Sequence, residues 1–148
     1  MIQAVFILLA CAFAAATDDL CRNVTTTGNV CGMPMKWKNQ LNSTMVISCK
    51  NGFLTGRYSS AVGEAEDFYS LSGTYTITGM DHQDIVLGWS VAYNNTVHGN
   101  SNSTCSWSGI YFAHEKIIHT HWVLTTHKER NDLWSASRVG HDIFHSIC

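Results

Sequence analysis

The carboxylate of Asp142 is the group in this sequence whose setting most clearly points to specific chemistry. It lies in the last long segment, Trp134–Phe144, and in an extended strand successive side chains point to opposite faces. Its face is then shared by Trp134, Ala136 and Gly140. Because acids are rarely buried without a partner, an acid among such residues indicates a polar group aimed into an enclosed space. We expect Asp142 to line that space.

The same alternation groups aromatic and short hydrogen-bonding side chains on common faces of other segments. These groups are Trp37, Asn39 and Leu41; Tyr58 and Ser60; Ser103, Cys105 and Trp107; and Trp122 and Leu124. Such a lining suits a compact ligand with an apolar body and a polar head. The chemistry that these residues favour is therefore binding.

An enzymatic function has little support. No Ser or Cys carries the signature of an activating base, and no paired-carboxylate or metal-hydrolase motif is present. His119 and His121 would place two imidazoles on one strand face, with His141 nearby. A metal site, however, requires more ligands in a fixed geometry. We predict a protein that is not an enzyme, with no metal and no catalytic cofactor.

Eight short segments typical of β-strands would position these residues, and no helical periodicity competes with them. The segments are Lys36–Leu41, Thr44–Cys49, Phe53–Ser59, Leu71–Thr78, Ile85–Tyr93, Cys105–Ala113, Lys116–Thr126 and Trp134–Phe144. They predict an all-β fold, either an eight-stranded antiparallel up-and-down β-barrel or a sandwich. The barrel is favoured because the long connections follow odd-numbered strands and would gather at one mouth. A barrel of this size can hold one small ligand.

The N-terminal region is typical of an exported protein. Residues 1–16 contain a short apolar core followed by Ala14–Ala16, as in a secretory signal peptide. We expect an N-terminal extension at 17–30 and the barrel domain at 31–148. The formal net charge of −2 provides no basic surface for nucleic acid, and no later apolar run suits a membrane span. The prediction is a secreted, extracellular protein.

Cysteine and asparagine usage fits this location. Of the six cysteines, Cys11 would leave with the signal peptide, and the remaining five cannot all pair within one chain. Cys105 is our choice for the unpaired thiol because its parity points inward. Candidate glycosylation sites are the Asn-X-Ser/Thr sequons at Asn23, Asn42, Asn94 and Asn102.

Seven motifs occur in order along the chain: Lys36–Leu41, Thr55–Tyr58, Ser60–Gly63, Leu87–Trp89, Trp107–Gly109, Trp122–Leu124 and Val139–Asp142. Together they resemble the motifs of the avidin/streptavidin family of biotin-binding proteins. The resemblance extends from about Cys31 to Phe144. It implies an eight-stranded barrel, usually a homotetramer, that binds biotin as a ligand and not as a cofactor.

The resemblance also implies a role for each matching residue. The ureido oxygen of biotin would accept hydrogen bonds from Asn39, Ser43 and Tyr58. The ureido N–H groups would donate to Ser60 and Asp142. The rest of the lining would be Leu41, Val62, Tyr93, Cys105, Trp107, Trp122 and Leu124, with Ser103 and the backbone of Gly63 and Glu64 at the carboxylate. Trp134 would extend into the biotin pocket of a neighbouring subunit.

Three departures from the family pattern bear on affinity. Tyr93 stands where the family usually has Trp, Cys105 replaces a Thr beside the ligand's sulfur, and Glu64 would repel the ligand's carboxylate. We expect tight binding that falls short of the family's extreme. These three residues also fit an alternative function, that of a secreted β-barrel carrier with a lipocalin-like role for another small hydrophobic ligand. A third possibility is a structural extracellular protein linked between chains through Cys148.

Two further expectations concern pairing and assembly. Cys31 matches a disulfide position of avidin, but the matching partner position here is Tyr111, so the bond would be absent or redirected to Cys21, Cys49 or Cys148. The outward residues His121, Val139 and His141 match a subunit-interface patch. We expect protonation of these histidines near pH 5–6 to weaken that contact.

Overall fold

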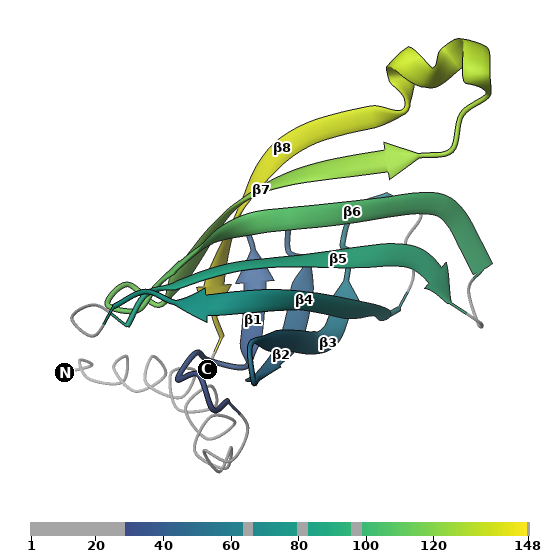
Figure 1. Cartoon of the computed structure of the whole chain (residues 1–148). Coiled ribbons are helices and arrows are strands. Elements are labelled where there is room, and N and C mark those ends of the chain that lie inside the picture. Colours follow the sequence, from purple (N-terminus) through teal and green to yellow (C-terminus); the bar gives the residue numbers. More distant parts are fainter. Residues whose placement is uncertain (1–28, 64–66, 80–82, 96–98, 148) are drawn as a thin grey trace, which may run out of the picture.

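The chain folds as a closed antiparallel barrel of eight strands in sequence order (Figure 1). The computed structural model describes residues 29–63, 67–79, 83–95 and 99–147. The expected signal peptide, Glu64 and the sequon at Asn23 lie outside these ranges. The strands are β1 (Lys36–Asn39), β2 (Thr44–Lys50), β3 (Phe53–Ser59), β4 (Tyr69–Ile77), β5 (Ile85–Asn95), β6 (Gly99–Phe112), β7 (Ile117–Thr126) and β8 (Ser137–Ser146). The predicted all-β barrel is confirmed.

Most strand boundaries lie within two residues of the prediction, and two strand starts differ by three residues or more. β6 begins at Gly99 instead of Cys105, because β5 and β6 continue as a hairpin in which Asn94 pairs with Asn100. The last strand begins at Ser137, and the residues before it form a short 3-10 helix, η1 (Arg130–Ser135).

The expectation that Trp134 shares a strand face with Asp142 is therefore wrong. Trp134 belongs to η1 and is 85% exposed. The reason is local: the backbone N–H of Ala136 donates to the carbonyl of Leu133, which closes a tight turn just before the strand. Only from Ala136 onward is the chain held in the sheet, where the carbonyl of Ala136 accepts from the N–H of Thr126.

Aromatic and aliphatic side chains fill one end of the barrel. Trp37 meets Tyr111 edge to face at 5.7 Å, and Trp89 meets Phe144 at the same centroid distance. Such edge contacts add to the stabilisation from apolar burial. The hydrophobic core therefore lies at the end opposite the connections after β3 and β7.

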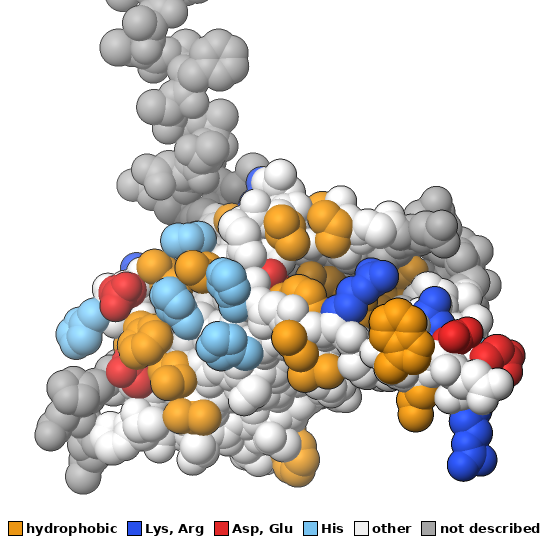
Figure 2. All heavy atoms as spheres, turned by 90° about the horizontal axis from the view of Figure 1, so that it is seen from above, with side chains coloured by type: hydrophobic (Ala, Val, Ile, Leu, Met, Phe, Trp, Pro, Cys, Tyr) orange, Lys and Arg blue, Asp and Glu red, His pale blue; other side chains and the backbone are white. Residues whose placement is uncertain are grey.

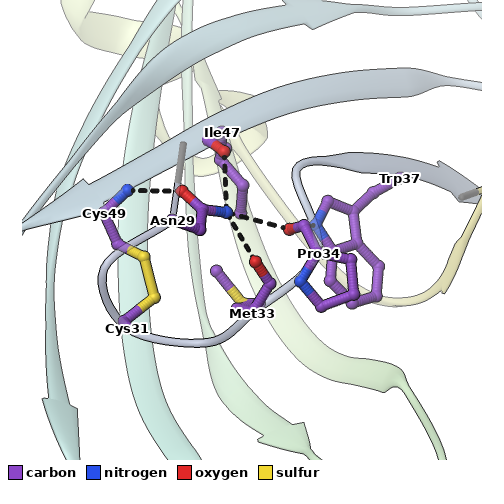
Figure 3. Close-up of a disulfide and its surroundings, with 7 residues drawn as sticks. All are labelled: Asn29, Cys31, Met33, Pro34, Trp37, Ile47 and Cys49. Carbon is purple, nitrogen blue, oxygen red and sulfur yellow. Dashed lines mark hydrogen bonds between the residues drawn. A yellow bond between two sulfur atoms is a disulfide. The ribbon is translucent and has the colours of Figure 1, made fainter. Parts of the chain in front are cut away.

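The segment before β1 is anchored beneath this core by Asn29 and a disulfide (Figure 3). The amide nitrogen of Asn29 donates to the carbonyls of Met33 at 2.6 Å, Pro34 at 3.2 Å and Ile47 at 3.3 Å, and its oxygen accepts from the N–H of Cys49 at 3.0 Å. The disulfide joins Cys31 to Cys49, one of the three partners that the sequence left open.

Across the described ranges, no helix has the length and apolar character of a membrane span.

Candidate functional site

The inner wall of the barrel, on the mouth side of the core, carries six buried side chains able to donate or accept hydrogen bonds or to stack. They come from β1, the turn after it, β3, β6 and β8, and they are Asn39, Ser43, Tyr58, Cys105, Trp107 and Asp142. The strand alternation seen in the sequence places the five strand residues there, since each shares its parity with core residues of its own strand, and Ser43 follows in the turn between β1 and β2. All six were expected to line a common pocket, and the structure brings them together.

Asn39 provides a buried donor without a partner. Its Oδ1 accepts from the backbone N–H of Leu41 at 3.1 Å and of Ser43 at 2.8 Å, which holds the turn after β1 and fixes the amide orientation. Its Nδ2 is buried and has no hydrogen-bond partner among the described residues. A buried unsatisfied donor costs about 1–3 kcal/mol. This amide is therefore poised to donate to an oxygen that enters the barrel.

Ser43 and Tyr58 place two hydroxyl groups beside that donor. The Ser43 Oγ accepts from the backbone N–H of Ala61 at 3.0 Å and is also hydrogen-bonded to the Tyr58 side chain. Burial raises the pKa of Tyr58 to about 12; the Ser43 hydrogen bond acts in the opposite direction, and the negative charges of Asp142 and of ionised Cys105 add to the rise. Tyr58 therefore remains a neutral phenol at physiological pH.

Asp142 is the acceptor that faces these donors, and it is only 3% exposed. Its Oδ2 accepts from the indole N–H of Trp107 at 2.9 Å, and its Oδ1 accepts from the side-chain amide of Gln40 at 3.1 Å. The Oε1 of Gln40 in turn accepts from the backbone N–H of Ile143 at 3.0 Å. Because a carboxylate offers about four lone-pair positions, Asp142 can accept further hydrogen bonds from a ligand.

Gln40 is a site residue that the sequence analysis missed. It follows Asn39 and has the opposite parity, so the pattern assigns it to the outside of the barrel. Its contact with Asp142 joins residues 102 positions apart in the chain. No short-range signal could have revealed this contact.

Aromatic rings form the apolar part of the wall. Tyr58 lies against Trp107 with ring centroids 5.0 Å apart, and Trp89 stacks behind Trp107 at 5.7 Å with an interplanar angle of 15°. Tyr93 meets Tyr69 edge to face at 5.2 Å. Trp89 therefore supports the wall from the core, whereas Tyr69 is a wall residue that was not identified from the sequence.

Trp122 and Leu124 continue the wall on β7, where both are partly buried. In register they lie opposite Trp107 and Cys105, respectively. Gly140 of β8 pairs with Trp122, and a Cβ at Gly140 would lie 2.3 Å from the Cζ2 atom of that indole. The glycine therefore leaves the space that the Trp122 ring occupies.

Cys105 and Tyr93 are neutral groups within this wall. Burial raises the pKa of Cys105 to about 12, with the charge of Asp142 adding to the rise, so the thiol stays protonated at neutral pH. Burial likewise raises the pKa of Tyr93. Among the described residues Cys105 is the free cysteine, as predicted. A protonated thiol is a poor nucleophile, which fits a binding surface better than a reactive one.

The remaining candidates lie at the rim. The Ser60 hydroxyl donates to the carbonyl of Val62 at 2.9 Å, and Ser103 shares a 2.6 Å hydrogen bond with Ser101. Leu41 and Val62 are exposed, and Gly63 has a positive φ of 77°. These residues edge the mouth without closing it.

Candidates of three other kinds lie away from the inner wall. Trp134 projects from η1 into solvent. The candidate glycan acceptors Asn42, Asn94 and Asn102 are exposed. The proposed interface residues His121, Val139 and His141 are exposed on the outer face of β7 and β8, where His121 and His141 lie directly opposite each other.

Comparison with known proteins agrees with this geometry. The model of the Avidin family matches residues 27–147. The chain is also similar to avidin-related protein 4/5 of Gallus gallus, with 32% identity over 127 residues that cover 80% of this chain and 79% of the relative.

Proposed function

The chain belongs to the avidin family, whose members are non-catalytic binding proteins, and we propose that it binds biotin inside the barrel. The observation that carries this proposal is the arrangement of donors and acceptor on the inner wall. Asn39 has a buried, unpaired N–H group, two hydroxyl groups lie beside it, and a buried carboxylate is held by neutral donors. A cyclic urea offers the matching pattern of one carbonyl oxygen and two N–H groups.

The carbonyl oxygen of the ureido ring accepts from Asn39, Ser43 and Tyr58. Hydrogen bonds to an oxygen that carries negative charge are stronger than neutral ones, and three converging donors favour such polarisation, as in an oxyanion hole. The raised pKa of Tyr58 keeps its proton in place for this role. Binding also relieves the unsatisfied donor of Asn39, which contributes to affinity.

The ureido N–H groups donate to Asp142 and Ser60. Gln40 and Trp107 hold the carboxylate of Asp142 in position through its two oxygens. In this role the Ser60 oxygen accepts a hydrogen bond from the ligand. Its hydroxyl proton can go on donating to the carbonyl of Val62, because a hydroxyl group donates and accepts at the same time. Gln40 is a positioning residue in this scheme and does not touch the ligand.

The ring system and the chain of the ligand contact the aromatic wall and the rim. Trp107, Trp122 and Leu124 pack the bicyclic rings, together with Leu41, Val62, Tyr93 and Cys105 at the sides. Ser103 with the backbone of Gly63 and Glu64 receives the carboxylate. Replacement of a hydroxyl by the Cys105 thiol costs about 0.5–1.5 kcal/mol, the usual net contribution of one hydrogen bond.

Assembly and location complete the proposal. The protein is a secreted homotetramer in which Trp134 covers the pocket of a neighbouring subunit, and His121, Val139 and His141 contribute to a subunit interface. The exposure of Trp134 supports this role, because a large apolar side chain that is 85% exposed gains by burial in an assembly. Neither a metal nor a catalytic cofactor takes part.

A thermal melt with and without excess biotin tests the proposal. A ligand that binds only the folded state stabilises it by RT ln(1 + [L]/Kd), so biotin at 1,000 times Kd adds about 4 kcal/mol. The Asp142→Ala variant serves as the control and should lose most of the shift. An unchanged melting temperature in well-folded wild-type protein would refute biotin binding. The carrier of another small hydrophobic ligand, favoured by Tyr93 and Cys105, would then be tested with apolar fluorescent probes.

A further inference from the structure

Beyond the pocket, the outward-facing positions of β6, β7 and β8 carry no permanent charge, and the exposed Arg138 is the charged residue next to them on β8. The outward positions of these strands, between Thr104 and Phe112, Ile117 and Thr125, and Ser137 and His145, carry Ser, Thr, aliphatic, Phe and His side chains. Arg138 and Asp142 have the opposite parity. We call this surface the histidine face. A water-exposed sheet surface is normally rich in Lys, Glu, Asp and Arg, so its neutrality indicates a surface that another molecule covers.

Apolar side chains and two hollows give the histidine face its shape. Val139 is 77% exposed and Val123 is 46% exposed, and they lie opposite each other in register. A hollow of about 410 Å³ lies beside Ile110 and Ile143, and another of about 490 Å³ lies beside Val123 and Val139. The side chains of His121 and His141 line both hollows. The two valines line the larger hollow, so the face offers apolar surface for a second copy to cover.

Three histidines form a compact group on this face. His121 of β7 and His141 of β8 are directly opposite in register, and His119 lies two residues before His121 on the same side. Residues directly opposite on neighbouring strands have Cβ atoms about 5 Å apart, and diagonal neighbours lie within about 8 Å. Figure 2 shows histidine side chains gathered among hydrophobic ones on this side of the barrel. When protonated, these imidazoles repel one another.

Few other ionisable groups face this histidine group. Across β6, His121 is opposite Ser108 and His119 is opposite Ile110. On the β1 side, the carbonyl of His141 accepts from Gln40, and the carboxylate of Asp142 is turned inward to Trp107 and Gln40.

The charges near the face lie at its margins. At the closed end, Lys38 of β1 is opposite His145, and the turn before β7 contains His114, Glu115 and Lys116. At the mouth end, η1 contributes Arg130 and Asp132. Among the described residues, no outward acid of β6–β8 is available to neutralise protonated His119, His121 and His141.

We propose that the histidine face is a proton-sensitive contact between two copies of this chain, closed when the histidines are neutral and opened when they are protonated. The proposal rests on the homo-oligomer proposed above and adds its regulation. In an isologous interface each residue faces the same surface patch of the partner, so an uncharged patch is compatible with itself. A protonated patch brings like charges together in a desolvated space, which opposes association.

The sign of the pH dependence follows from this geometry. Burial in an interface disfavours the charged form of histidine, so the assembled state binds fewer protons than the separated chains. Assembly is then complete at pH 7.5 and is lost as the pH falls through the range in which histidine titrates. Each proton that must be released on association lowers the association constant about tenfold for every pH unit below the titration of that histidine. An interface that releases one proton from each copy loses about 100-fold per pH unit.

Sedimentation velocity of the full secreted chain at pH 7.5 and pH 5.0, without biotin, tests the proposal. We expect wild type to form a larger species at pH 7.5 and a smaller one at pH 5.0. The double variant H121Q/H141Q, neutral at both values, should keep the larger species at pH 5.0. The matched control H114Q/H127Q changes two exposed histidines outside the face and should behave as wild type.

A second variant locates the contact without removing a histidine. V139K places a permanent charge at the most exposed apolar position of the face, where a folding defect is not expected, and it should form the smaller species already at pH 7.5. Circular dichroism confirms that each variant is folded.

The outcomes separate this proposal from the proposed function. Wild type of the same size at both pH values overturns the switch, and so does H121Q/H141Q that dissociates in the same way as wild type. Assembled V139K at pH 7.5 shows that the contact lies elsewhere and also overturns it. Biotin binding by wild type, followed by tryptophan fluorescence at pH 7.5, tests the pocket by a measurement that does not depend on any change of size with pH.

Discussion

Replacement of Asn39 by Ala tests the inner-wall donor directly. In the free protein the substitution has two opposing effects. It removes the Oδ1 that accepts from the buried N–H of Ser43, and it also removes an Nδ2 that is buried without a partner. Each unsatisfied buried group costs about 1–3 kcal/mol. The two effects offset, and we expect the melting temperature of the ligand-free protein to change by only a few degrees.

Biotin binding should respond much more strongly to the same substitution. In wild type the ligand satisfies the Asn39 donor and recovers the 1–3 kcal/mol that its isolation costs, whereas in Asn39→Ala nothing is recovered. At about 1.4 kcal/mol per factor of ten, Kd should rise about 5- to 150-fold. The biotin-induced increase in melting temperature should shrink accordingly, and competition with a fluorescent biotin conjugate would give Kd directly.

Asn39→Asp tests the amide oxygen and the amide nitrogen of this side chain separately. It keeps the oxygen that accepts from Leu41 and Ser43 but turns a second oxygen toward the ligand's carbonyl. Binding should therefore weaken at least as much as in Asn39→Ala. If either variant bound biotin within about threefold of wild type, a shift below the lower limit of the effect, the Asn39 amide would not be a ligand contact and the reasoning would fail.

Three further perturbations test the packing, the disulfide and the thiol. Gly140→Ala should destabilise the protein by about 1–3 kcal/mol, the usual cost of overpacking, because the new Cβ overlaps the Trp122 ring; Gly79→Ala, with open space around it, is the control in the same thermal melt. Cys31→Ser should cost about 3 kcal/mol by opening an 18-residue loop, and a melt that moves by less than a degree would contradict this. Stability should decline as the pH rises from about 9 toward 12, because the pKa of Cys105 is raised from 9.0 to about 12 in the folded state and the unfolded thiol ionises first. Denaturant titrations should find a shallower decline between pH 9 and 10 in Cys105→Ala.

The inner wall was largely predictable from the sequence because a strand has a period of two. Once a segment is extended and one face contains core residues, the direction of every other side chain follows. Asn39, Tyr58, Trp107 and Asp142 were assigned in this way, and each is buried on the inner face. Their convergence also required closure of the sheet, which the strand count and the positions of the long connections indicated.

For Trp134 the same reasoning gave a wrong prediction. The alternating pattern runs through Ser135 without interruption, so the sequence predicted a continuous strand. Backbone hydrogen bonds at Leu133 and Ala136 close a 3-10 turn instead. Such turns are short and leave little periodic signal.

The disulfide illustrates a limit of a different kind. Cysteine counting predicted one unpaired thiol, and the family resemblance left the Cys31 bond either absent or redirected to one of three partners. The choice of Cys49 depends on the end of β2 lying beside the chain segment before β1, where Asn29 bridges both. Connectivity of this kind is set by spatial proximity, which composition and parity do not contain.

The sequence by itself therefore determined the strand segments, their inward faces and the chemical character of the lining, because these depend on local alternation. Only the tertiary structure decided which groups hold one another: Gln40 on Asp142 across 102 positions, Gly140 against Trp122, and His121 opposite His141. These contacts depend on strand register and barrel closure, which bring distant residues together within a few ångströms. The physical reason is that hydrogen bonding and packing act over contact distances, whereas a sequence pattern reports only the direction in which each side chain points.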